Sequence, residues 1–219
     1  LIDTGALNTS QITTLTTAAS AQTVSLTSTA GPLTLGANIG NALDNLTLIA
    51  TAGNIEGGAG TATGNNVTLT ATNGGIGIVT TVNTNSNTLV LMSGGAAAAG
   101  NITVIEATAT SLTATTNAAT TQTIDVTLTT GDLTVGGAIG DALDNVTLRT
   151  LAGNIVGSAS TITANALTLN ASGGIGIGTA VTANATTYSL TTAGAGAAGN
   201  ITLIDTGALN TSQITTLTT

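Results

Sequence analysis

The carboxylates are the side chains of this sequence that are best suited to chemistry. Asp141 and Asp144 stand three residues apart and could join in a Ca²⁺ site, because Ca²⁺ is bound by about six to eight oxygen ligands. The equivalent positions of an earlier repeat hold Asn41 and Asp44, and an amide is the poorer ligand. This pair is the nearest approach to a metal site in the sequence. We expect no metal and no other cofactor to be required.

Most acids recur with the repeats described below. Asp3, Glu106 and Asp205 occupy equivalent positions, and Asp44 is equivalent to Asp144. An acid that returns with a structural repeat is typical of a corner or of a solvent-facing position. We therefore expect these carboxylates to be structural.

Catalysis is not expected. The chain has no His, Lys or Cys, and its one Arg, Arg149, replaces Ile49 of the earlier repeat. Ser and Thr are abundant, but a hydroxyl nucleophile needs an adjacent base. Glycoside hydrolysis needs two carboxylates at a set separation, and no unique cluster of acids is present. We predict that the protein is not an enzyme and has no catalytic or cofactor-binding residues.

The composition indicates a thin core and disfavours nucleic acid and anionic membranes as partners. Charged residues make up 5% of the 219 residues, whereas about 25% is usual. Hydrophobic residues make up 42%, but Phe and Trp are absent and there is one Tyr. A core filled by Val, Ile, Leu and Ala must be narrow, as in a β-solenoid. The net charge of −8 disfavours nucleic acid and anionic membranes, and no apolar run reaches the ~20 residues of a membrane span.

A spaced aliphatic pattern organises the elements that carry these residues. Counting from a first aliphatic, further aliphatics fall at plus two and plus nine, and Gly falls at plus seven. The pattern starts at Val24, Leu46 and Val67, and again at Ile124, Val146 and Leu167, and Tyr188 continues the spacing of these starts. The Leu167 copy lacks one residue. Consecutive starts lie roughly 21–22 residues apart, and a fixed period of this length is typical of a solenoid.

The same pattern places corners between strands. Leu46 and Leu48 alternate with polar residues, but the next aliphatic, Ile55, lies an odd seven residues after Leu48. Inward side chains of one straight strand are separated by even steps, so the chain must turn, most simply at Ala52-Gly53. We predict an all-β, parallel β-helix or β-solenoid with about 21–22 residues per turn, in which Leu48 and Leu69 lie one above the other.

Longer repeats are superimposed on the turns. Residues 1–17 recur identically at 203–219, which defines a 202-residue unit, and this unit is itself two copies of about 100. We expect one continuous solenoid cut from a longer array. Residues 1–23 complete a preceding set of turns, 24–123 form the first repeat, and 124–219 form the second and enter the next unit. The step from Leu89 to Ile102 is little more than half of the usual period. It predicts either a short turn or a bulge or one-turn helix at residues 96–99.

Three phrases carry a resemblance to a known family. They are Asn-Leu-Thr-Leu-Ile-Ala-Thr-Ala-Gly-Asn-Ile at 45–55, Gly-Asn-Ile-Thr-Val at 100–104 and Leu-Thr-Leu-Asn-Ala-Ser-Gly-Gly-Ile-Gly-Ile at 167–177. The chain resembles the repeats of filamentous-haemagglutinin-type adhesins. That resemblance implies a right-handed β-helix shaft of a large exoprotein on a bacterial surface or in the extracellular space. The near absence of charge and the near-identical long repeat depart from a typical adhesin and indicate a giant fibre.

Several functions remain open at this level. We expect a mechanical shaft whose partners are neighbouring repeats of the same chain, with a glycan-binding tip outside this window. The alternatives are an adhesive face that itself contacts glycan, a filament that associates sideways with other copies, and an ice-binding face built from Thr61, Thr63, Thr161 and Thr163. Asn-x-Ser/Thr sequons are frequent, and they could be glycosylated or could form ladders between turns; they include Asn8, Asn45, Asn66, Asn101, Asn145, Asn170, Asn184 and Asn200.

Overall fold

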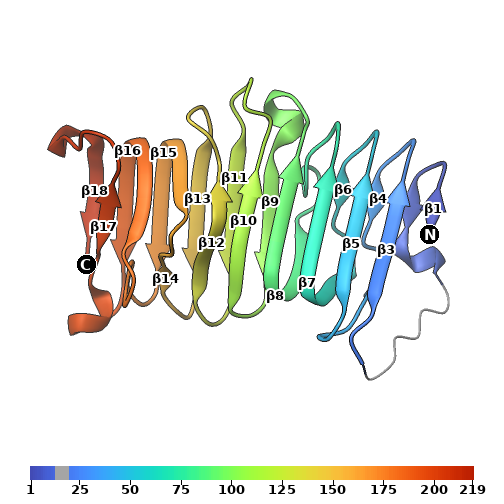
Figure 1. Cartoon of the computed structure of the whole chain (residues 1–219), viewed down its shortest axis with the longest axis horizontal. Helices are drawn as coiled ribbons and strands as arrows, with labels where there is room; N and C mark the ends of the chain where they lie inside the picture. The colour runs from blue at the N-terminus through green and yellow to red at the C-terminus, as the bar shows by residue number, and fades with distance from the viewer. Residues whose placement is uncertain (13–19) are drawn as a thin grey trace.

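The computed structural model is a rod of stacked parallel strands (Figure 1). It describes residues 1–12 and 20–219, so residues 13–19 of the predicted segment 1–23 lie outside the described residues. Within the described ranges the chain forms strands and single-turn 3-10 helices, without an α-helix. The prediction of an all-β parallel solenoid is confirmed.

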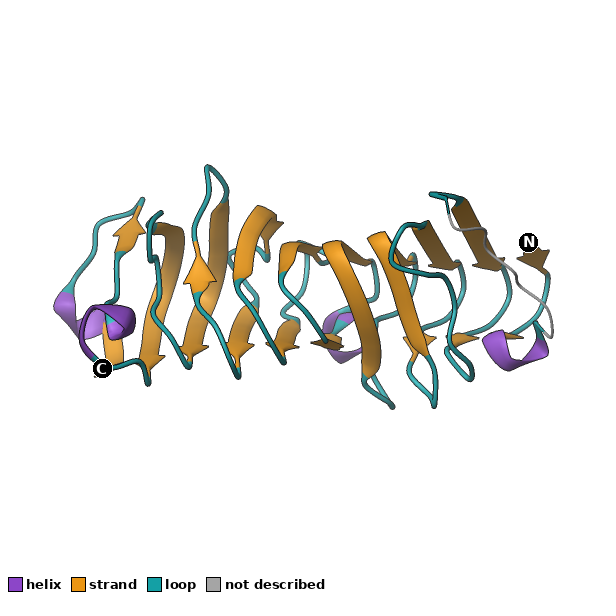
Figure 2. Cartoon of the chain, turned by 90° about the horizontal axis from the view of Figure 1, so that it is seen from below, coloured by secondary structure: helices purple, strands orange, loops and turns teal. Residues whose placement is uncertain are grey.

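The elements follow one another from one end of the rod to the other, and Figure 2 shows the short helices at its two ends and its middle. The strands are β1 (Ile2–Asp3), β2 (Leu7–Asn8), β3 (Thr23–Ser28), β4 (Leu33–Thr34), β5 (Asn45–Ala50), β6 (Ile55–Glu56), β7 (Thr61–Ala71), β8 (Val82–Ser93), β9 (Ile102–Glu106), β10 (Thr110–Thr115), β11 (Thr123–Leu128), β12 (Leu133–Ile139), β13 (Asn145–Thr150), β14 (Ile155–Val156), β15 (Thr161–Ala171), β16 (Val181–Thr192), β17 (Leu203–Asp205) and β18 (Ile214–Thr218). The helices are η1 (Thr9–Gln11), η2 (Ala97–Gly100), η3 (Gly196–Gly199) and η4 (Thr211–Gln213).

Strand β5 shows how the sequence builds one rung. Leu46, Leu48 and Ala50 are buried, whereas Asn45, Thr47 and Ile49 face outward, because successive side chains of a strand point to opposite faces. Leu48 lies in parallel register with Leu69, as predicted.

The first column of aliphatic side chains contains the pattern starts of the first repeat. They pair in order along the rod: Val24, Leu46, Val67, Leu89, Leu112 and Val135. Each is buried. Their alignment fixes the register, because a slip of one residue would turn every inward side chain outward.

The corner after β5 is tight and depends on glycine. The chain bends at residues 51–53 before β6 begins at Ile55, where the odd step of seven predicts a turn. A Cβ on Gly53 would lie 2.7 Å from the Gly31 carbonyl carbon of the turn below. Corner backbones of adjacent turns therefore approach more closely than any side chain allows.

The second column lies across the core from the first and holds the plus-nine residues of the first repeat. Its members pair in the order Leu7, Leu33, Ile55, Ile76, Ile102, Ile124, Val146, Leu167, Tyr188 and Ile214. The later members, from Ile124 to Tyr188, are the pattern starts of the second repeat. Equivalent strands of the two repeats therefore lie on opposite sides of the core.

The short step between Leu89 and Ile102 causes this change of sides. After β8 the chain makes the one-turn helix η2, and Ile102 then stacks on Ile76 of the second column. Ser93 closes the corner, since its hydroxyl donates to the carbonyls of Gly74 at 3.0 Å and Gly100 at 2.5 Å. The predicted one-turn helix is thus present, and the step advances the chain by half a turn.

Because each half of the 202-residue unit adds a half-turn, the whole unit comprises a whole number of turns. Nine successive pairings connect the rung of Leu7 to the rung of Ile214, which belong to the identical segments 1–17 and 203–219. The 202-residue unit is therefore nine whole turns, and each half unit is four and a half. A unit ends on the side of the core on which it began.

Candidate functional site

Asp44 and Asp144 are buried at equivalent corners. The carboxylate of Asp44 accepts from the N–H of Asn41 at 3.0 Å and from the N–H of Gln22, one turn below, at 3.2 Å. Asp144 accepts in the same way from Asp141 at 3.1 Å and from Gln122 at 3.2 Å. Each carboxylate thus satisfies backbone donors of two turns and joins them at the corner.

Asp141, the other half of the predicted calcium pair, serves the same turn. Its Oδ1 accepts from the N–H of Leu143 at 2.7 Å, while its Oδ2 has no hydrogen-bond partner. The Thr116 hydroxyl donates to Asp144 at 2.5 Å, so three donors surround the buried carboxylate. Burial raises the pKa of Asp144 against these hydrogen bonds, and the charge of Asp141 raises it further. Within the described ranges no group of three or more acidic, His or Cys side chains is placed to hold a metal.

Glu106 is the most enclosed of the second set of acids. Its carboxylate accepts from the N–H and the hydroxyl of Ser86, at 2.8 and 2.9 Å, and from the N–H of Ala107 at 3.1 Å. Burial raises the pKa of Glu106, opposed by hydrogen bonds from Thr84, Ser86 and Thr108. This acid joins adjacent turns in the core and faces no solvent-filled cleft.

The equivalent acids at the rod ends make related contacts. Asp3 accepts from the N–H of Gly5 at 2.6 Å, and Asp205 accepts from the N–H of Gly207 at 2.5 Å. The Tyr188 hydroxyl also donates to Asp205, and burial followed by this hydrogen bond raises the Tyr188 pKa. The residue pattern did not reveal the Tyr188–Asp205 contact.

Glu56 is a buried acid that the sequence pattern did not single out. It accepts from the N–H groups of Val79 and Thr80 in the next turn, at 3.0 and 3.1 Å, and from the Asn54 amide at 2.9 Å. The second repeat has Val156 at the equivalent position, so recurrence offers no signal.

Polar outward positions form columns, but threonine does not recur along them. Thr61 pairs with Asn83 of the next turn and Thr63 pairs with Asn85, because Val82 points inward. In the second repeat Thr161 pairs with Thr182 and Thr163 with Asn184. Thr-x-Thr pairs therefore do not continue from turn to turn.

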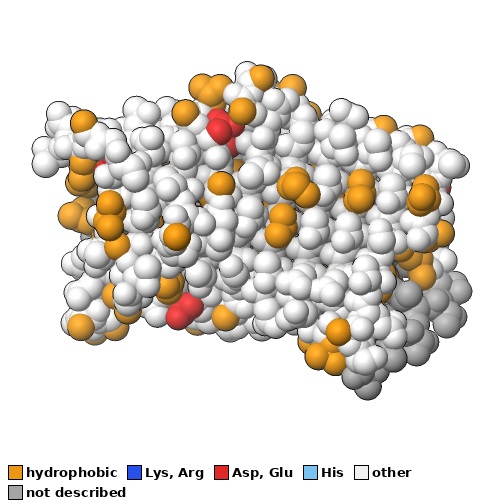
Figure 3. Space-filling model, viewed as in Figure 1, with side chains coloured by type: hydrophobic (Ala, Val, Ile, Leu, Met, Phe, Trp, Pro, Cys, Tyr) orange, Lys and Arg blue, Asp and Glu red, His pale blue; other side chains and the backbone are white. Residues whose placement is uncertain are grey.

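One side of the rod is without charge between β3 and β10. The strands β3, β5 and β10 and the residues 66–71 and 88–93 contain no acidic or basic residue, and we call their outward side the uncharged face. The view in Figure 3 shows isolated acidic side chains near the rims and small scattered apolar patches. Arg149 lies on the other side, 4.0 Å from Asp125 and 3.1 Å from the Thr127 hydroxyl.

Asparagine side chains, including those of several sequons, are engaged between turns. The Asn66 amide donates to Asn45 at 2.5 Å, and Asn87 donates to Asn65 at 2.9 Å. Asn101 accepts from the N–H of Thr123 at 2.8 Å. Short ladders of the predicted kind are therefore present.

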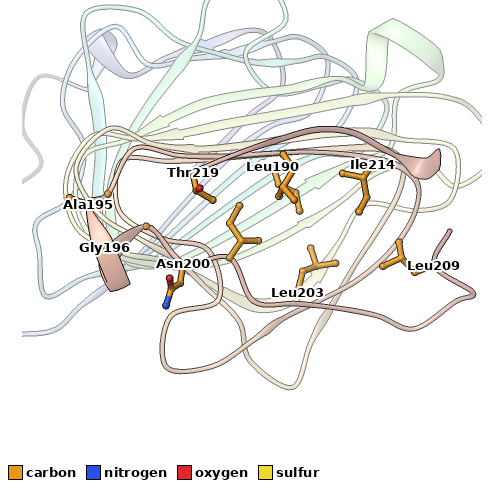
Figure 4. A pocket seen from close by; sticks show the side chains of 12 residues that line it. Leu190, Ala195, Gly196, Asn200, Leu203, Leu209, Ile214 and Thr219 are labelled. Carbon is orange, nitrogen blue, oxygen red and sulfur yellow. The ribbon is translucent and has the colours of Figure 1, made fainter. Parts of the chain in front are cut away.

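An apolar groove of about 710 Å³ lies at the C-terminal end of the rod (Figure 4). Its apolar walls include Leu190, Leu203, Leu209, Ile214 and Leu217. These residues were not singled out as site residues. Leu203, Leu209, Ile214 and Leu217 belong to the segment 203–219, which repeats residues 1–17.

Comparisons with known proteins found no match. No family model, no curated protein and no solved structure matches this chain. Among the described residues, no helix has the length and apolar character needed to cross a membrane.

Proposed function

We propose that this chain is a shaft segment of a giant repetitive protein of the bacterial cell surface or extracellular space, with a mechanical and non-catalytic role. The proposal rests on the nine-turn closure of the 202-residue unit. Successive units would continue both aliphatic columns without a break, and each would lengthen the rod by about 43 Å at the usual strand spacing of about 4.8 Å.

The distribution of polar groups supports a mechanical role. The buried acids Asp44, Glu56, Glu106 and Asp144 all accept from donors in adjacent turns. Their hydrogen bonds strengthen the connection between turns, and such connections stabilise a solenoid, in which each repeat contacts only its neighbours. The resemblance to filamentous-haemagglutinin-type repeats supports the surface location.

The second candidate is an adhesive rod whose uncharged face contacts glycan or another copy. The outward hydroxyl and amide groups of this parallel sheet favour this reading. An ice-binding face is a weaker candidate, because the Thr61 and Thr63 column passes to Asn83 and Asn85.

Electron microscopy with an antibody raised against this chain tests the shaft proposal. We expect label on thin single threads outside intact source cells, at intervals consistent with a unit of about 43 Å. Label confined to the cell interior would contradict the proposal. A glycan array tests the adhesive alternative, with Thr68→Arg as the matched variant. Retention of the native chain that this variant loses would support binding through the uncharged face and would count against an inert shaft.

A further inference from the structure

One Asn-Gly sequence occurs in the chain, at Asn73-Gly74. It lies in the corner that follows β7, where Asn73 is exposed and Gly74 is buried. Asparagine is reactive in this context, because the backbone nitrogen of the next residue can attack the side-chain amide carbon and glycine has no Cβ to obstruct the approach. Every other asparagine of the chain is followed by a residue that carries a Cβ. This corner is therefore where such an attack is least hindered.

The hydrogen bonds around the corner leave the attacking nitrogen free. The Thr72 N–H donates to the Ala50 carbonyl at 2.9 Å, and the Gly75 N–H donates to Oδ1 of Asn54 at 3.1 Å. The Gly74 N–H lies between these two anchored groups and donates to no other group in the described part of the chain. The nitrogen that would react is thus not engaged in a hydrogen bond.

The equivalent corner of the second repeat differs at both points. Ser172 precedes Gly173 there, so the reactive amide is absent. The Gly173 N–H donates to the Gly153 carbonyl at 2.8 Å, so the equivalent nitrogen is engaged. The solenoid therefore builds this corner without an Asn-Gly sequence, and the second repeat supplies a matched control.

The Asn73 side chain is held by a contact with the turn below. Its Nδ2 donates to the Thr51 carbonyl at 2.8 Å. This bond lies at the exposed surface, where water replaces a broken hydrogen bond, so it opens at little cost in free energy. Once it opens, the side chain is free to rotate toward the Gly74 nitrogen.

We propose that Asn73 is a site of spontaneous deamidation in the folded protein. The Gly74 nitrogen attacks Cγ of Asn73 and loses its proton to water, while the Cγ–Nδ2 bond breaks and ammonia leaves. Water then opens the resulting cyclic imide. Cleavage of the bond between Cγ and the Gly74 nitrogen gives aspartate, whereas cleavage of the bond between the main-chain carbonyl carbon and that nitrogen gives isoaspartate.

Either product alters the contact between turns. A carboxylate cannot donate to the Thr51 carbonyl, so the hydrogen bond of Asn73 is lost. Isoaspartate also lengthens the main chain by one carbon where Gly74 is tightly packed, since a Cβ there would lie 2.5 Å from the Gly53 carbonyl oxygen. The Gly74 carbonyl, which accepts from the Gly95 N–H at 3.0 Å, would shift with the main chain. The reaction therefore weakens the corner and adds a negative charge beside the uncharged face.

Peptide mapping by mass spectrometry tests the site on the full chain, incubated in its folded state at mildly alkaline pH. We expect the peptide that contains Asn73 to be deamidated, to a mixture of aspartate and isoaspartate, faster than any peptide that contains another asparagine. Asn184 is the internal reference, because it is exposed and is followed by Ala185. The variant Asn73→Ser, which copies Ser172 of the second repeat, should show no change at this corner. The inference concerns a covalent change in one corner and does not depend on the proposed shaft function.

Melting temperatures measure the consequence for stability. The deamidated chain should melt about 2–4 °C below the fresh chain, which is the shift expected from the loss of one hydrogen bond in a chain of this size. Asn73→Asp should lower the melting temperature of the fresh chain in the same direction, since it removes the same donor. Asn73→Ser should melt at the same temperature before and after incubation. A deamidated chain that melts like the fresh one would contradict the weakened corner.

Two further results would overturn the inference. The first is an Asn73 amide that persists in the folded chain for as long as the urea-unfolded chain takes to lose it, because the folded corner would then protect the amide. The second is deamidation of Asn184 at the same rate as Asn73, because the free Gly74 nitrogen would then confer no preference.

Discussion

Ile102 pairs with Ile76 across adjacent turns and not with Leu89, although Leu89 is nearer in sequence. This pairing places Ile102 in the second column. Ile124, the first pattern start of the second repeat, pairs with Ile102 and therefore lies in the second column too. Every strand of the second repeat is therefore displaced by half a turn relative to its copy in the first. Two such steps restore the original side, so the 202-residue unit and not the 100-residue repeat is the translational unit.

The half-turn depends on the packing of Gly100 against Gly95. A Cβ on Gly100 would lie 2.1 Å from the Gly95 carbonyl oxygen. We expect Gly100→Ala to lower the free energy of unfolding by about 1–3 kcal/mol, as overpacked positions do. Urea denaturation followed by circular dichroism measures this. Ala98→Ser, at an exposed position of the same helix, is the control and should leave the midpoint unchanged.

The aliphatic columns should dominate stability. Leu69 is fully buried between Leu48 and Leu91, so Leu69→Ala should cost about 2–5 kcal/mol in the free energy of unfolding. Thr68→Ala changes the adjacent outward position of the same strand and should cost at most about 0.5 kcal/mol. If chemical denaturation shows the same loss in the free energy of unfolding for both variants, the aliphatic columns are not the main source of stability.

Corner acids should matter through their hydrogen bonds and not through a metal. Asp144→Ala leaves the N–H groups of Gln122 and Asp141 without their acceptor and should lower the free energy of unfolding by about 1–3 kcal/mol. The native melting temperature should be the same with added Ca²⁺ as with a chelator. A rise in that temperature with Ca²⁺, absent in Asp141→Asn, would instead establish the calcium site.

Burial of Glu106 should make the rod more stable in mild acid than at neutral pH. Its pKa is raised above 4.5 in the folded state, so the folded protein binds a proton more tightly than the unfolded chain does. The stabilisation is complete below the unfolded value and is lost as the pH rises through the higher folded value. Asp144 shifts in the same direction and adds to the effect.

Thermal unfolding at a series of pH values checks this linkage. We expect the melting temperature of the native chain to rise as the pH falls from neutral toward about 4.5. Glu106→Gln should flatten the profile, because an amide still accepts from the Ser86 N–H but does not titrate. Asp144→Asn in addition should flatten it further. A native profile with the opposite slope would refute the assignment.

Much of the fold is predictable because it depends on local regularities. Alternation within β5 determines which side chains are buried, and the odd step from Leu48 to Ile55 locates a corner. The recurrence of this pattern at a nearly constant interval then requires strands to stack in parallel, since a narrow aliphatic core can be buried only by adjacent turns. The recurrence of Asp44 and Asp144 also predicted a corner position, but it did not predict that Glu106 is fully buried, since a corner or solvent-facing position was expected for it.

Tertiary structure alone decided which column each strand joins. The segment of Gly and Ala before Ile102 is compatible with several backbone paths, and only its packing between Ser93 and the neighbouring corner selects the half-turn. The partners of Glu56 and Tyr188 were also decided by the tertiary structure. They belong to neighbouring turns, and the alignment of those turns along the rod brings each pair into contact. The amino-acid order by itself determined the repeating rung, because side-chain alternation is local. The side of the core on which each rung begins depends on corner geometry that small residues do not encode.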